Sequence, residues 1–257
     1  RAPQAFDADM HIAFAGGGIQ TVRLADDLEE ERSQSWSASF NYDKPTEKHI
    51  WGFTREGFYT RLNDAFILEE IGTDDSGNSI LEKRNGAGSE VLGATTELRG
   101  NYSRKIQLEA GLTVQKSEYE NPVEWSEELP GTKDYLRSPE AYGYYTLTWT
   151  PSDKFKAALA GIYTGSMLIP HYGLPGDTGT PDNDILFESP DFLETNLKVS
   201  YIFNAQRLDS SIELFGGVGN IFDQYQDDFD QGKNRDSGYV YGPAKPGNFF
   251  VGLKIFN

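Results

Sequence analysis

The chain has 257 residues, of which 40 are acidic and 23 are basic, so its formal net charge is −17. An acidic surface of this kind excludes a nucleic-acid binder, because neutralising phosphates requires clustered Lys and Arg. The absence of Cys excludes disulfides and thiolate chemistry. No apolar run is long enough for a membrane-spanning helix.

Apolar and polar side chains alternate with a period of two along most of the chain. In residues 193–203, for example, Leu197 and Val199 fall on one side while Lys198 falls on the other. Such alternation places one strand face in an apolar medium and the other in a polar one. The pattern predicts an all-β fold. In chain order, the nine expected strands are residues 33–43, 48–66, 90–102, 104–117, 140–151, 153–165, 193–204, 208–219 and 246–257.

The expected strands are joined by short turns and long loops in alternation. Successive connections of an up-and-down sheet lie at opposite ends, so all the long loops share one end. Strands of ~9–11 residues or more can cross a bilayer, whereas soluble strands average ~5–6. Outer-membrane barrels have short periplasmic turns and longer extracellular loops. The pattern therefore predicts an antiparallel transmembrane β-barrel. Its long loops are residues 67–89, 118–139, 166–192 and 220–245.

The number of expected strands, nine, is odd, whereas single-chain bacterial outer-membrane barrels have even numbers. An open sheet in hydrocarbon would leave two edges of unpaired backbone groups, each costing several kcal/mol. We therefore expect residues 1–257 to be the C-terminal part of a larger barrel, with the earlier strands elsewhere.

Two other protein classes share part of this pattern. A soluble β-sandwich, such as a lectin-like binding module, also shows alternating strands, but its apolar faces would meet each other. An outer-membrane hydrolase would need an activated nucleophile or water beside a base. The chain has three His and lacks a Ser-centred elbow motif, so an enzyme is not expected.

Several segments together resemble a known family. Residues 219–223 read Gly-Asn-Ile-Phe-Asp, and a loop containing Gly242 and Pro243 leads to the last expected strand. Residues 1–3 read Arg-Ala-Pro, and residues 28–33 read Leu-Glu-Glu-Glu-Arg-Ser. In this order they resemble the C-terminal barrel portion of TonB-dependent outer-membrane receptors. Residues 163–172, Tyr-Thr-Gly-Ser-Met-Leu-Ile-Pro-His-Tyr, resemble a segment of Bacteroidota-type members.

The resemblance implies a complete receptor of about 22 strands around an N-terminal plug domain, with the plug and earlier strands absent from this chain. Such receptors bind a scarce nutrient (cobalamin, an iron-siderophore or haem) at extracellular loops. They import it with energy that TonB transmits. The implied partners are outer-membrane lipid, the remainder of the receptor, the TonB complex and, in some members, a surface lipoprotein. The implied location is the bacterial outer membrane.

Aromatic side chains in the long loops are the candidate ligand-binding residues, because aromatic rings provide large contact areas at low entropic cost. The alternative for each is that it packs the loops together. His and Met side chains also bind haem iron, so one His and one Met of the long loops are candidates as well. The candidates are Tyr119, Trp125, Met167, His171, Tyr172, Tyr225, Tyr239 and Tyr241.

Three closely spaced carboxylates, Asp227, Asp228 and Asp230, form the candidate metal site. Calcium takes several oxygen ligands at ~2.3–2.6 Å, and acidic loops can supply them. The spacing does not match a helix–loop–helix calcium loop, and the alternative is a solvated acidic surface. An acidic mouth would also disfavour an anionic ligand.

Overall fold

The computed structural model describes residues 21–73, 79–126, 129–173, 181, 183–205, 210–232 and 235–256. The Arg-Ala-Pro segment, residues 1–3, lies outside them. The described residues form strands joined by turns and loops, without a helix. No helix in this part of the chain is long and apolar enough to cross a membrane.

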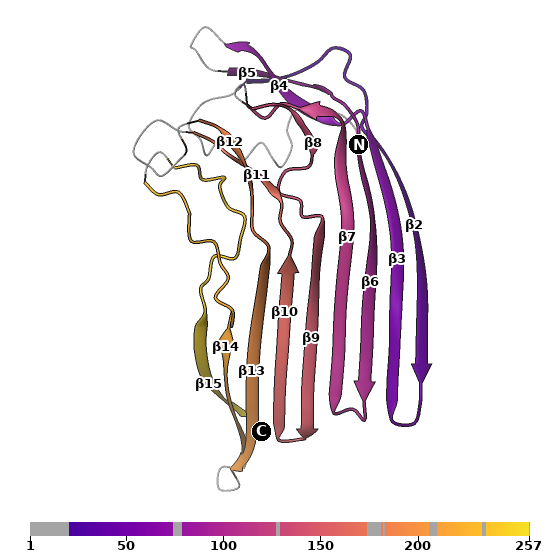
Figure 1. Ribbon diagram of the computed structural model, residues 1–257, viewed down its shortest axis with the longest axis vertical. Coiled ribbons are helices and arrows are strands. Elements are labelled where there is room, and N and C mark those ends of the chain that lie inside the picture. Colours follow the sequence, from indigo (N-terminus) through magenta and orange to yellow (C-terminus); the bar gives the residue numbers. More distant parts are fainter. Residues whose placement is uncertain are drawn as a thin grey trace.

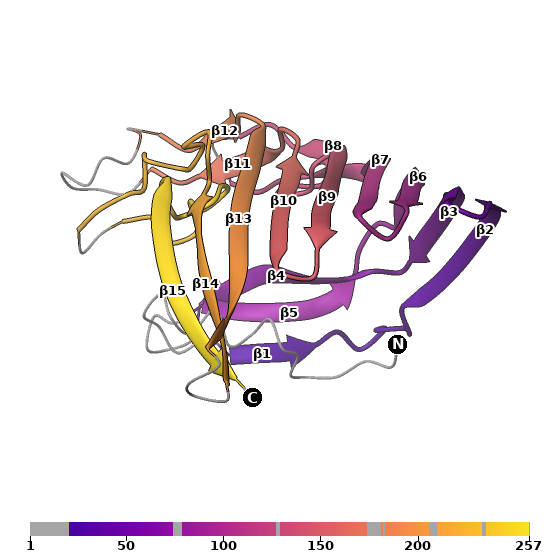
Figure 2. The same ribbon diagram turned by 90° about the horizontal axis from the view of Figure 1, so that it is seen from below.

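Nine long strands build one antiparallel sheet in which each strand pairs with the next along the chain. Seen from below, the sheet is a curved arc from β2 to β15 (Figure 2). Within the described residues, β2 and β15 each pair on one side, so the molecule is a partial barrel. The strands are β2 (Arg32–Pro45), β3 (His49–Asn63), β6 (Ser89–Tyr102), β7 (Ile106–Val123), β9 (Ala141–Ser152), β10 (Phe155–Thr164), β13 (Phe192–Ala205), β14 (Ser210–Gly219) and β15 (Asn248–Phe256).

All nine predicted strands are confirmed, most of them within a few residues of the predicted ends. Two predictions of strand length were wrong. The second strand ends at Asn63 because Asp64 takes a positive φ of 54°. The strand predicted at 104–117 continues to Val123 because its extension pairs with β6, Ser89 opposite Tyr119.

The long loops contain strands that the alternation did not predict. β4 (Phe66–Thr73) and β5 (Ser79–Asn85) form a hairpin, and β1 (Thr21–Leu24) adds to β5 in parallel. β8 (Thr132–Asp134) pairs with β7, and β11 (Leu168–His171) pairs with β12 (Ile185–Glu188). Figure 1 shows β4, β5, β8, β11 and β12 at the end opposite the short turns, and β1 lies there too because it pairs with β5. The predicted separation of short turns and long loops is confirmed.

The strand register sorts the side chains of the sheet onto two faces. Leu197 lies opposite Leu159 and Val218, and Leu214 lies opposite Leu253. Residues at these positions share a face, because directly paired side chains point the same way. The predicted apolar sets therefore form one continuous apolar face. Arg55, opposite Phe40 and Thr96, is an exposed cation within it.

The other face of the sheet is polar and internally hydrogen-bonded. Arg99 donates to Asp43 at 2.8 Å and to Thr54 at 2.8 Å, and Thr95 and Thr113 are linked at 2.9 Å. These polar side chains bond to one another, and all of them except the buried Thr113 are partly exposed or exposed. A hydrated lumen accounts for this composition.

Within the described ranges, no second layer covers the apolar face. The buried hydrophobic residues among those described are Ala25, Ile169, Phe192 and Tyr239, whereas Trp36 is 73% and Phe249 86% exposed. A soluble sandwich would bury these rings in a dry core. The sandwich alternative is therefore contradicted, and hydrocarbon is the medium that suits this face.

Aromatic pairs mark the short-turn end of the sheet. Trp149 and Phe155 pack edge to face with their ring centroids 5.4 Å apart. The ring centroids of Tyr201 and Phe203 are 4.7 Å apart. Tyr42 and Trp51 form a similar pair at 5.5 Å. Such rings form the girdles that flank the apolar band of outer-membrane barrels.

Candidate functional site

The loop between β10 and β13 packs against the loop between β14 and β15, and His171 is the centre of that contact. Its Nε2 lies 3.1 Å from both carboxylate oxygens of Asp230, and the two side chains are 8% and 2% exposed. The imidazole also stacks on Tyr239, with ring centroids 3.6 Å apart and 9° between the planes. Strand β11 positions His171, which is the last residue of β11 and lies opposite Ile185 of β12.

Asp228 receives two phenolic hydrogen bonds from residues of its own loop. Tyr239 donates to one carboxylate oxygen at 2.9 Å and Tyr241 donates to the other at 2.8 Å. Burial, together with the bond to the Asp228 carboxylate, raises the pKa of Tyr241 to about 12. The same causes raise the pKa of Tyr239 well above its ordinary value. Both phenols therefore stay protonated donors at neutral pH.

We expect Tyr241 to ionise late in an alkaline titration. Its folded-state pKa of about 12 exceeds the ordinary 10.0, so this stabilisation is complete below pH 10 and is lost as pH rises through 12. Tyrosinate absorbance at pH 11 should be nearly the same in the native protein and in Tyr241→Phe. In Asp228→Asn the ionisation should move to lower pH. A clear drop in absorbance at pH 11 in Tyr241→Phe would contradict the assignment.

Two buried amides support the β14–β15 loop. Gln226, 1% exposed, donates to the carbonyl of Tyr239 at 3.1 Å and accepts from the N–H of Tyr241 at 2.9 Å. Asn220 is left-handed at φ 47° and donates to the carbonyls of Gln224 and Lys245, each at 3.0 Å. The Asn of the Gly-Asn-Ile-Phe-Asp motif thus holds the start of this loop to its end.

A second aromatic cluster joins the end of β7 to the loop between β7 and β9. Tyr119 lies 4.3 Å from Tyr135 and 6.2 Å from Trp125, measured between ring centroids. Within the described residues, the buried indole Nε1 of Trp125 has no hydrogen-bond partner. An unpaired buried donor is costly, so this nitrogen is a group that an added acceptor would satisfy.

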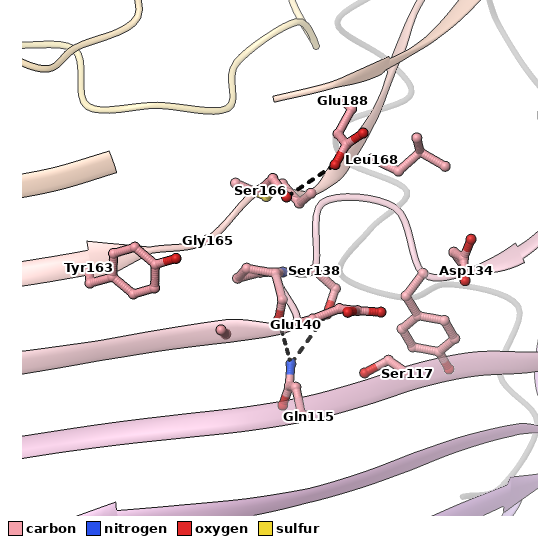
Figure 3. Close-up of a pocket in the computed structure, with 14 residues that line it drawn as sticks. Gln115, Ser117, Asp134, Ser138, Glu140, Tyr163, Gly165, Ser166, Leu168 and Glu188 are labelled. Carbon is pink, nitrogen blue, oxygen red and sulfur yellow. Dashed lines mark hydrogen bonds between the residues drawn. The ribbon is translucent and has the colours of Figure 1, made fainter. Parts of the chain in front are cut away.

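A cavity of about 470 Å³ opens where the extracellular ends of β7, β9 and β10 diverge. Figure 3 shows Gln115 and Ser117 on one side and Ser166 with Glu188 on the other. Ser166 donates to Glu188 at 3.2 Å, and the Gln115 amide reaches the Pro139 carbonyl at 3.3 Å. The lining residues are Gln115, Ser117, Asp134, Tyr135, Ser138, Pro139, Glu140, Ala141, Tyr163, Gly165, Ser166, Met167, Leu168 and Glu188.

The chemistry of this cavity is that of hydrogen-bond acceptors beside aromatic surface. Asp134, Glu140 and Glu188 supply carboxylates, and Tyr135 and Tyr163 supply rings. None of the described lining residues is Lys or Arg. Its volume falls within the ~300–1,000 Å³ typical of ligand pockets.

The predicted site residues divide between these places. His171, Tyr239 and Tyr241 lie together and pack the loops, while Tyr119 and Trp125 form the separate cluster. Met167 lines the cavity. Tyr172 follows His171 and donates its backbone N–H to Asp236 at 3.1 Å, and Asp236 in turn donates its N–H to Asp230 at 3.0 Å. Tyr225 is half-buried.

The three carboxylates of the candidate calcium site do not converge. Asp228 binds two phenols, Asp230 binds His171, and Asp227 is exposed. In the part of the chain that the structure describes, no group of three or more His, Asp or Glu side chains could hold a metal ion. The calcium prediction gains no support from this arrangement.

Apart from Met167, sequence reasoning missed the residues that line the cavity, and it also missed the amides that support the loops. Gln115 and Glu140 meet because the backbone N–H of Gln115 donates to the Glu140 carbonyl at 2.7 Å. The polar-face position of Gln115 at a strand end was the available signal. For Gln226 no local pattern marked a buried amide.

The comparisons with known proteins agree on the fold. No family model matches the chain, and no curated protein matches it. Among solved structures, the ferric-catecholate import receptor Fiu from E. coli K12 is similar at TM-score 0.61 and 19% identity, covering 90% of this chain and 28% of that one. The ferripyoverdine receptor of the outer membrane of Pseudomonas aeruginosa is similar at TM-score 0.61 and 14% identity, covering 89% of this chain and 27% of that one. The FrpB iron transporter from Neisseria meningitidis is similar at TM-score 0.54 and 13% identity, covering 92% of this chain and 32% of that one.

At these identities the likeness is one of fold, and the chain spans 27–32% of each neighbour's length. The predicted fold class, an antiparallel outer-membrane β-barrel of which this chain is a part, is confirmed. The fold and its apolar outer face support the predicted location in the bacterial outer membrane. The neighbours named are receptors or transporters rather than enzymes. The resemblance to Bacteroidota-type members stays a prediction.

Proposed function

We propose that this chain is the C-terminal part of an active-transport receptor of the bacterial outer membrane. Its extracellular loops bind a scarce nutrient, and the complete receptor imports it with energy transmitted by TonB. The plug domain and the earlier strands, bringing the barrel to about 22, belong to the remainder of the receptor.

The observation that carries this proposal is the contrast between the two ends of the sheet. Among the described residues, the short-turn end bears turns alone, whereas the other end bears a layer of hairpins and loops (Figure 1). The acceptor-lined cavity lies at that second end. Buried contacts such as His171 with Asp230 hold that layer together. A recognition layer above a wall with one polar face suits capture from outside followed by passage through a lumen.

The cargo we propose is an iron-siderophore, with cobalamin and haem as further members of the same class. Fiu is described as a ferric-catecholate import receptor, and the Pseudomonas receptor was solved with ferripyoverdine bound, which supports an iron chelate. Haem has less support, because Nε2 of His171 is held by Asp230. An acidic cavity favours a cargo that presents hydrogen-bond donors over one that presents anionic oxygens.

In this mechanism the sheet is a rigid wall and the loops supply recognition. The proposed partners are outer-membrane lipid, the remainder of the receptor, the TonB complex and a surface lipoprotein. Nucleic acid is excluded by the net charge of −17. Co-purification of a lipoprotein with the receptor would test that last partner.

A binding titration of the full receptor tests the proposed function. Purified receptor in detergent would be titrated with a ferric catecholate siderophore, ferripyoverdine, cyanocobalamin and haemin, with tryptophan fluorescence as the signal. We expect saturable binding of one of them. Ser166→Trp should weaken it by tenfold or more, since a ring would enter the cavity that Ser166 lines and displace bound cargo.

The matched control is Ser152→Trp, which places the same ring at an exposed position of the short-turn end. It should bind like the native receptor. Saturable binding that is unaffected by Ser166→Trp would move recognition away from the cavity. Absence of binding by all four compounds would reject the proposed cargo class.

A further inference from the structure

The apolar face is hollowed at the short-turn end of β3, β6 and β7. The hollow measures about 360 Å³, and Trp51, Gly100 and Leu108 lie side by side across it. Gly100 leaves the space open: a Cβ built there would meet only Leu108, at 3.9 Å. His49 and Tyr102, whose rings stack 6.2 Å apart, also line the hollow.

Four exposed cations lie on the strand and turns next to this hollow, in a chain that is strongly acidic. Lys44 lies directly opposite Trp51 in the β2–β3 ladder. Lys48 belongs to the β2–β3 turn, and Arg104 and Lys105 belong to the β6–β7 turn. The two turns are joined, because the N–H of Ser103 donates to the carbonyl of Lys48 at 2.6 Å.

None of these four cations forms an ion pair within the described residues. Of the two nearby carboxylates, Asp43 is already bound by Arg99, while Glu47 is exposed in the first turn. The cations outnumber the uncompensated acid, so this rim is locally positive. A positive rim beside an apolar hollow matches a molecule with an anionic head and an apolar tail.

The β6–β7 turn keeps a cation at a position that rarely takes one. Ser103 and Arg104 both have positive φ, 51° and 57°, and the N–H of Lys105 donates to the Tyr102 carbonyl at 2.9 Å. Asn and Gly are preferred in such two-residue turns. Asn101 compensates by accepting from the Arg104 N–H at 3.0 Å. Conformational strain that is retained in this way points to a functional use.

We propose that this hollow binds an anionic phospholipid of the membrane leaflet on the short-turn side. One acyl chain lies against Trp51, Gly100 and Leu108, and the head-group phosphate is bound by Lys44, Lys48 and Arg104. The stacked rings of His49 and Tyr102 mark the boundary between chain and head group. The site is separate from the extracellular cavity and serves whichever nutrient the receptor carries.

Native mass spectrometry of the full receptor tests this site. The delipidated receptor in detergent would be mixed with equal amounts of dioleoyl phosphatidylglycerol and dioleoyl phosphatidylcholine. We expect phosphatidylglycerol to be retained at least tenfold more, and Gly100→Leu, which fills the hollow, to abolish the difference. Lys44→Gln and Arg104→Gln should each reduce retention about fivefold.

Two matched variants control for altered folding. Gly57→Leu changes a glycine of the same face that has open space around it, and Lys156→Gln removes an exposed cation from the opposite face. Both should retain phosphatidylglycerol like the native receptor. Equal retention of the two lipids, or retention that the turn variants do not change, would overturn the proposal. A receptor dimer that persists without lipid and is lost in Gly100→Leu would assign the hollow to a second copy instead.

Discussion

Leu197→Arg and Val199→Arg are each expected to destabilise the folded barrel by ~2–4 kcal/mol, the cost of a cation on the lipid face near the middle of a bilayer. Both residues lie on the apolar face, Leu197 between Leu159 and Val218 and Val199 between Ala157 and Gly216. The measurement is reversible unfolding of the complete receptor in phospholipid vesicles. Native-like barrel content before denaturation would show that each variant still inserts.

The control for this prediction is a charge change one residue away, on the polar face. Lys198 is exposed, and its ammonium lies 4.5 Å from the centre of the Phe215 ring. Lys198→Glu therefore loses one cation–π contact, worth ~0.5–1 kcal/mol at an exposed site. If Lys198→Glu lowered the free energy of unfolding as much as Leu197→Arg does, the assignment of lipid face and lumen face would be reversed.

Removing either partner of the His171–Asp230 pair is expected to release the extracellular loops. The two side chains are 8% and 2% exposed. Asp230→Ala leaves the buried imidazole without this acceptor, and His171→Ala leaves the buried carboxylate with the Asp236 N–H, at 3.0 Å, in place of two donors. Each loss is worth about 1–3 kcal/mol. His171→Ala also removes the ring that stacks on Tyr239. Protease cleavage within residues 220–247 of the inserted receptor should accelerate by roughly five- to hundredfold.

Asp227→Ala is the matched control, because Asp227 is an exposed carboxylate of the same loop. It should leave the cleavage rate unchanged. The double variant His171→Ala/Asp230→Ala should cost less than the sum of the single variants, since each single one already breaks the pair. Additive effects would show that the two residues stabilise the loop independently.

The strands were predictable from sequence because the solvent on each side selects each side chain. Leu197 and Lys198 are neighbours in the chain but face different media, and this difference is written into the alternation. β11 and β12 were missed because they are too short for an alternating pattern to be recognised. Each has four residues, too few for a period, and Pro170 within β11 is a residue that central strands exclude.

The candidate site was predictable in composition but not in arrangement. Aromatic and acidic loop residues do gather at the extracellular end, as expected. The sequence does not show that His171 would stack on Tyr239, 68 positions further on. Contacts between two loops depend on where the strands that carry them lie in the sheet, and no local pattern records that position. Several of these aromatics pack against one another between the loops, and their contact with a ligand stays a prediction.

In the part of the chain that the structure describes, β2 and β15 each have one flank without a pairing strand. Free N–H and C=O groups along a flank readily bond another strand, and they are unfavourable in hydrocarbon until they do. These strands are therefore suited to a split-protein design, in which two fragments are refolded separately and then mixed. Recovery of a sealed, protease-resistant pore on mixing would identify the segment that zips onto each flank.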